Sequence, residues 1–97
     1  MTALWIANVH VTDAEAYMRY ARLATGAIES FGGKFLARSG RHVQLEGRDR
    51  ARNVVARFPS VEAAVECYNS PAYQEALAFA KGAAERDLVI VEELQEG

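Results

Sequence analysis

The side chains best suited to act on a small molecule are one histidine and two arginines, each within or at the end of an extended segment. His10 is the only histidine in a predicted strand, and a neutral imidazole can serve as a general base or a ligand contact. The simpler alternative is a strand-end histidine that hydrogen-bonds to a neighbour or to water. Arg38 and Arg57 carry guanidinium groups suited to a carboxylate, either on a ligand or on Glu46 of the same chain.

Two asparagines share this setting. Asn8 and Asn53 could hydrogen-bond a polar ligand atom, although a bridging water would satisfy them equally well. We therefore predict a ligand-binding site formed by the side chains Asn8, His10, Arg38 and Arg57.

Other reactive residue types predict structure rather than chemistry. Cys67 lies within a predicted helix and is most simply a small packing residue, and Ser70 is a helix cap outside any G-x-S-x-G sequence. Tyr68 and Tyr73 fall on apolar helical stripes and are predicted core residues. No catalytic residue is assigned on this basis.

Metal and cofactor motifs are missing from the sequence. His10 and His42 are far apart and have neither a cysteine partner nor an H-E-x-x-H spacing, so no metal site is expected. Gly32 and Gly33 do not belong to a phosphate-binding glycine loop, which argues against ATP or a dinucleotide. We expect no cofactor.

Alternating residue patterns predict the strands that position these side chains. Leu4 to Val11 places Trp5, Ala7 and Val9 on a wholly apolar face and Asn8 and His10 on a mixed one. Arg52 to Phe58 likewise has a largely apolar face, which includes Arg52, and a mixed face. Further strands are expected at Lys34 to Arg38 and Leu88 to Glu93, with an extended piece at His42 to Glu46.

Capping signals predict the helices. Thr12 and Glu15 form a capping box for a first helix, whose apolar stripe runs from Tyr17 to Phe31 and which Gly32 and Gly33 end. Ser60 caps a second helix, which restarts at Ser70 and Pro71. The resulting order predicts a ferredoxin-like α+β fold, βαββαβ, with a four-stranded antiparallel sheet and both helices on one face.

The uncovered sheet face predicts a homodimer. Ile6 and Val55 make this face too apolar for an ordinary solvated surface, whereas Asn8 and Arg57 make it too polar for a dry core. Two copies that pair sheet to sheet would bury it around a polar cavity. The alternative is a monomer with an exposed sheet.

Length and composition limit the classes of function. The 97 residues fit a single domain over 1–97, and one cysteine excludes an internal disulfide framework. The net charge of -2, with interspersed signs, argues against nucleic-acid binding. Without an apolar run of membrane-spanning length or a secretory signal, a cytoplasmic protein without membrane association is expected.

Several segments together match a known pattern: Trp5 to Ala7, Val11 to Tyr17, Phe31 to Arg38, Leu45 to Gly47, Phe58 to Ser60, and Tyr68 to Tyr73. The chain thereby resembles the small bacterial family called domain of unknown function 1330, within the dimeric α+β barrel superfamily. The resemblance covers nearly the whole chain and implies a ferredoxin-like protomer whose sheet packs on a second copy to form a barrel.

Three functions stay open. The superfamily includes cofactor-independent monooxygenases, isomerases, haem-degrading enzymes and ligand-sensing domains, so the resemblance implies shape rather than activity. We expect a homodimer that binds a small organic ligand, an anion among the options, in the barrel interior. The alternatives are a cofactor-independent monooxygenase or isomerase with His10 as base, and a purely structural dimerisation module.

Overall fold

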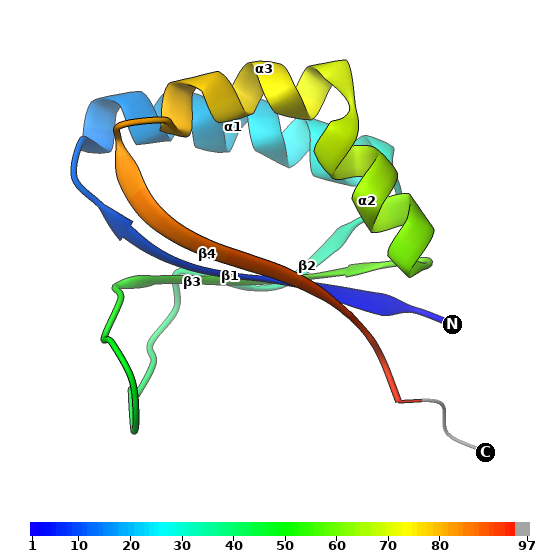
Figure 1. Cartoon of the computed structure of the whole chain (residues 1–97), viewed down its shortest axis with the longest axis horizontal. Coiled ribbons are helices and arrows are strands. Elements are labelled where there is room, and N and C mark those ends of the chain that lie inside the picture. The colour runs from blue at the N-terminus through cyan, green and yellow to red at the C-terminus, as the bar shows by residue number, and fades with distance from the viewer. Residues whose placement is uncertain (95–97) are drawn as a thin grey trace.

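One antiparallel sheet carries all the helices on one of its faces. The structure is a computed structural model that describes residues 1–94. Its elements are β1 (Ala3–Val11), α1 (Ala14–Ser30), β2 (Lys34–Arg38), β3 (Arg52–Phe58), α2 (Val61–Asn69), α3 (Pro71–Ala80) and β4 (Ala84–Glu92). The strand order is β2-β3-β1-β4, and the helices lie together over the sheet (Figure 1). The predicted ferredoxin-like arrangement is confirmed.

The N-caps of α2 and α3 are the predicted serines, whereas the N-cap of α1 is a different residue from the one predicted. Ser60 and Ser70 accept the backbone N–H groups of Ala63 and Tyr73, which confirms both caps. The Thr12 cap was wrong by one position, because Asp13 accepts from the N–H of Ala16. The Thr12 N–H bonds instead to the carbonyl of Ala83, at 2.8 Å.

The strand bounds of β2 and β3 agree with prediction, whereas two other expectations were wrong. β4 begins at Ala84 and not Leu88, because its polar first half pairs with the end of β1, Val9 opposite Arg86. His42 to Glu46 forms no strand with the described chain. It belongs to the loop 39–51, which lies on the side of the sheet opposite the helices (Figure 1).

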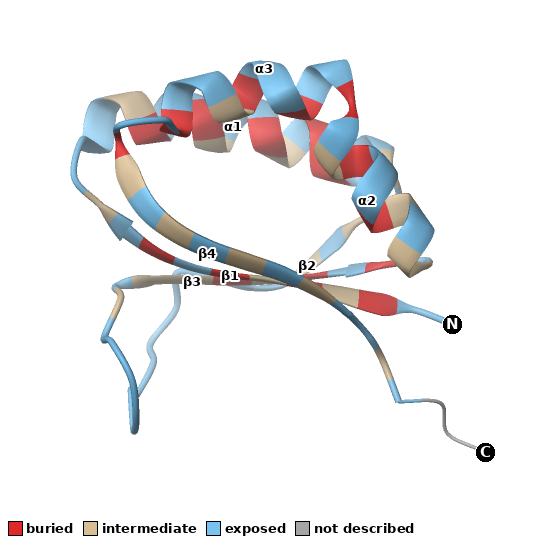
Figure 2. Cartoon of the chain, in the orientation of Figure 1, coloured by how far each residue is buried: buried red, intermediate tan, exposed pale blue. Residues whose placement is uncertain are grey.

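The two faces of the sheet differ as their alternation predicts. Trp5, Val9 and Phe58 are buried beneath the helices, and the Trp5 ring packs against Phe58 and Tyr73 with centroids 5.6 and 5.1 Å apart. No helix within residues 1–94 covers the opposite face (Figure 2). Across its middle, Ile6 pairs with Val55 on one side and Val89 on the other.

None of the helices in residues 1–94 is both long enough and apolar enough to cross a membrane.

Gly33 joins α1 to β2 where a side chain has no room. A Cβ atom there would lie 2.8 Å from the backbone oxygen of Ile28 and 2.9 Å from Cζ of Phe58. We expect Gly33→Ala to lower the free energy of unfolding by about 1–3 kcal/mol, the usual cost of overpacking. Urea denaturation would measure this loss.

Gly26, in the middle of α1, provides the matched control. A Cβ atom at this position meets nothing within 4 Å. Gly26→Ala should therefore stabilise the protein by roughly 0.5–1 kcal/mol, because alanine is the better helix former. Equal effects of the two substitutions would contradict the close contact at Gly33.

Candidate functional site

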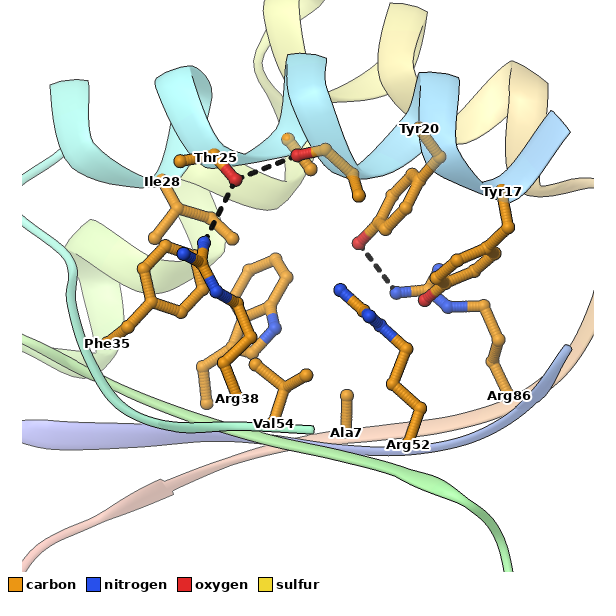
Figure 3. A pocket seen from close by; sticks show the side chains of 13 residues that line it. Ala7, Tyr17, Tyr20, Thr25, Ile28, Phe35, Arg38, Arg52, Val54 and Arg86 are labelled. Carbon is orange, nitrogen blue, oxygen red and sulfur yellow. Dashed lines mark hydrogen bonds between the residues drawn. The ribbon is translucent and has the colours of Figure 1, made fainter. Parts of the chain in front are cut away.

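A cavity of about 30 Å³ lies between α1 and the covered face of the sheet. The cavity is partly open to solvent, so a ligand need not lie wholly inside it. Its apolar wall includes Trp5, Ile28, Phe35 and Val54. The polar groups around it are Tyr17, Tyr20, Thr25, Arg38, Arg52 and Arg86 (Figure 3).

A β-bulge turns Arg38 toward this cavity. The pairing of β2 with β3 shifts by one residue between Phe35 and Ala37, so Phe35 and Arg38 both lie on the helix side although three positions apart. The Arg38 guanidinium carbon lies 4.4 Å from the centroid of the Phe35 ring. The same group donates a hydrogen bond of 3.2 Å to the hydroxyl of Thr25 on α1 (Figure 3).

Arg52 enters the cavity from the first residue of β3. It shares its strand face with Val54 and Ala56, which are buried. Its guanidinium carbon lies 5.3 Å from the centroid of the Tyr17 ring. The buried Nε–H of Arg52 has no hydrogen-bond partner within the described chain. The same is true of the Nε–H of Arg86.

Arg86 joins the cavity to a pair of tyrosines. Its Nη2 donates to the hydroxyl oxygens of Tyr20 and Tyr73, at 2.8 and 3.2 Å, and the two hydroxyls lie 2.6 Å apart. Burial, together with the neighbouring Tyr73, raises the pKa of Tyr20 above its ordinary value, and burial also raises the pKa of Tyr73. Both hydroxyls therefore keep their protons at neutral pH.

The arginines of the cavity lack the carboxylate partners that three other arginines of the described chain have. Three others, Arg48, Arg50 and Arg57, each form an ion pair, with Glu85, Asp87 and Glu93 respectively. No aspartate or glutamate lines the cavity within residues 1–94, and none pairs there with Arg38, Arg52 or Arg86. Three positive charges thus surround an apolar space, which raises the local concentration of anions.

The structure separates the four residues predicted to bind a ligand. Arg38 lines the cavity, whereas Asn8, His10 and Arg57 lie on the uncovered face of the sheet. On that face the Asn8 amide donates to Asn53 at 2.8 Å, and His10 is exposed opposite Glu85. A ligand-binding role for these three stays a prediction.

Arg57 has a different ion-pair partner from the one considered. Its guanidinium makes two hydrogen bonds to Glu93, of 2.6 and 3.2 Å, so Glu46 was the wrong partner. The hydrogen bond from Arg57 lowers the pKa of the Glu93 carboxyl. This pair is a surface contact of the uncovered face.

Sequence reasoning missed Arg52, Arg86 and Tyr20 as site residues. Arg52 had a usable signal, since it is a charged residue on an otherwise apolar strand face. Arg86 had none, because the predicted strand began two residues after it.

No group of three or more histidine, cysteine, aspartate or glutamate residues within residues 1–94 could hold a metal ion. The polar groups of the cavity are hydroxyls and guanidiniums, which suit an anion better than a cation.

The family model described as "Domain of unknown function (DUF1330)" matches residues 2–94. The chain belongs to the DUF1330 family. This membership confirms the resemblance of the sequence motifs. No functionally curated protein matches this DUF1330 chain.

Solved structures similar to this DUF1330 protein share its fold. RPA0582 of Rhodopseudomonas palustris, a protein of unknown function, is 25% identical with a TM-score of 0.79, over 98% of this chain and 84% of that one. A dimeric ferredoxin-like protein of unknown function from Jannaschia sp. CCS1 is 10% identical with a TM-score of 0.75, over 96% and 100%. SnoaB of Streptomyces nogalater, a cofactor-independent oxygenase, is 13% identical with a TM-score of 0.57, over 98% and 95%.

Proposed function

We propose that this protein is a homodimer in which each protomer binds a small organic anion between α1 and the sheet. The observation that carries the proposal is the set of three arginines, Arg38, Arg52 and Arg86, around one cavity without a carboxylate from residues 1–94.

The free-energy cost of placing unpaired positive charges around the cavity supports the binding of a ligand there. Arg52 and Arg86 are partly buried, whereas Arg38 is exposed. Partly buried cations that repel one another and have no counter-ion destabilise a fold, so a purely structural pair of this kind would be expected to have an acidic partner. A ligand carboxylate would supply the missing charge and would accept hydrogen bonds from the guanidinium of Arg52, which lines the cavity. The ring of Trp5 and the side chain of Ile28 would contact its carbon atoms.

Binding is better supported than the alternative of proton abstraction. A general base needs a pKa near the working pH. The titratable groups that line the cavity within residues 1–94 are tyrosines and arginines, and the pKa of Tyr20 is raised. His10, the base considered from sequence, lies on the other face of the sheet. The likeness to SnoaB is one of fold alone.

The uncovered face supports the homodimer. Val89 and Val91 of β4 are 54% and 46% exposed, and they flank a central strand that contributes Leu4 and Ile6 to the same face. A contiguous apolar patch of this kind is typical of an interface between subunits. The protein from Jannaschia sp. CCS1 that shares this fold is described as dimeric.

The anion site can be tested with Trp5, which lines the cavity and is the single tryptophan of the chain. Small carboxylic acids should change its fluorescence as they bind. We expect Arg52→Gln to raise the dissociation constant of the best acid roughly 10- to 100-fold, the effect of losing one hydrogen bond between charged groups.

Arg22→Gln is the matched control, because Arg22 is exposed on α1 and does not line the cavity. It changes the net charge by the same amount and should leave the dissociation constant unchanged. The anion site is refuted if no acid binds, or if the two variants weaken binding equally.

A further inference from the structure

The cluster of Tyr20, Tyr73 and Arg86 holds one hydroxyl proton that the described chain does not use. The three groups come from α1, α3 and β4, and each makes a hydrogen bond with the other two. A guanidinium can only donate, so both tyrosine oxygens accept from Arg86. Two hydroxyl protons remain, and only one can lie between the two oxygens.

Burial decides which hydroxyl keeps the unused proton. Tyr73 is fully buried and does not line the cavity, so an unused proton there would be an unsatisfied buried donor. The lower-energy arrangement has Tyr73 donate to Tyr20, whose oxygen then accepts both from Tyr73 and from Arg86. The proton of Tyr20 is left over, and the Tyr20 side chain lines the cavity (Figure 3).

The neighbours of Tyr20 make its hydroxyl a good donor and a poor base. Two hydrogen bonds accepted by one oxygen polarise its remaining O–H bond. The raised pKa of Tyr20 keeps that proton in place at neutral pH. A ligand in the cavity would therefore meet a hydrogen-bond donor in addition to the arginines.

We propose that Tyr20 donates a hydrogen bond to a ligand oxygen next to the carboxylate, so that the pocket selects 2-oxo acids over acids that lack the oxo group. This inference rests on the anion site proposed above. Tyr20 and Arg52 both line this small cavity, so a ligand whose carboxylate is held by Arg52 would place an acceptor on the adjacent carbon atom close to the Tyr20 hydroxyl.

Pyruvate and propionate are suitable probes, because they have the same carbon chain and carboxylate but differ in the oxo group. In Trp5 fluorescence titrations, we expect the wild-type protein to bind pyruvate roughly tenfold more tightly than propionate, the effect of one hydrogen bond. Tyr20→Phe should remove this preference by weakening pyruvate binding while leaving propionate binding unchanged.

Tyr68→Phe is the control, since the Tyr68 ring packs on Trp5 with centroids 6.1 Å apart but does not line this cavity. It should keep the preference for pyruvate. Equal affinities of the wild type for the two acids, or an undiminished preference in Tyr20→Phe, would overturn the role of Tyr20 and leave the anion site standing. Binding of neither acid would overturn this inference, and failure of every other carboxylate as well would overturn the anion site.

Discussion

Ile6→Glu is expected to convert the proposed dimer into monomers at micromolar concentration. Ile6 lies on the central strand of the uncovered face, between Val55 and Val89. In a symmetric dimer the substitution occurs twice, and each buried, unpaired carboxylate costs several kcal/mol. The dissociation constant should therefore rise by about a thousandfold or more. Sedimentation velocity over a range of concentrations would measure it.

Val65→Glu is the matched control for this substitution. Val65 is an apolar residue of α2 and is 42% exposed, but it lies on the helical side of the protomer. Its replacement should leave the sedimentation coefficient unchanged, and circular dichroism should show that both variants remain folded. A dimer that tolerates glutamate at position 6 would place the interface elsewhere.

The thiol of Cys67 is expected to react with a disulfide reagent at least about a hundredfold more slowly in the native than in the unfolded protein. The residue is fully buried, and among the described residues its thiol makes a single long hydrogen bond, of 3.7 Å, to the carbonyl of Ala27. Burial raises the pKa of Cys67 from 9.0 to about 11, so at pH 8 the reactive thiolate is roughly a hundred times scarcer.

The absorbance change of a chromogenic disulfide reagent would measure both rates, with and without urea. Cys67 is the single cysteine of the chain, so the signal comes from one site. Free glutathione in the same two buffers would correct for any effect of urea on the reagent. Rates within a few-fold of each other would mean that the native thiol is accessible, contrary to the packing of Cys67 of α2 against α1.

The alternation of apolar and polar residues along β1 and β3 was enough to predict which face of the sheet the helices cover. A shift by one residue would reverse every side chain of a strand, so the apolar parity of Trp5 and Phe58 determines the orientation of β1 and β3. Capping residues predicted the helix starts equally well at Ser60 and Ser70, because their effect is local.

The candidate site depends on features that no local pattern reveals. Arg86 belongs to a strand only because β1 pairs with it, and its two tyrosine partners are 66 and 13 residues away in sequence. Arg52 could have been found, since a charge on an apolar face of a strand either has a partner or serves a ligand. The prediction instead followed the mixed face, where polar residues are already satisfied by each other, as Asn8 is by Asn53.

The extra residue in β2 determines which side of the sheet Arg38 faces. Phe35 and Ala37 pair with adjacent positions of β3, so Leu36 is accommodated without a partner of its own. If β2 kept its length but paired regularly, Arg38 would point to the opposite side of the sheet. The cavity would then lose one of its three cations through a change of pairing alone, with no residue exchanged.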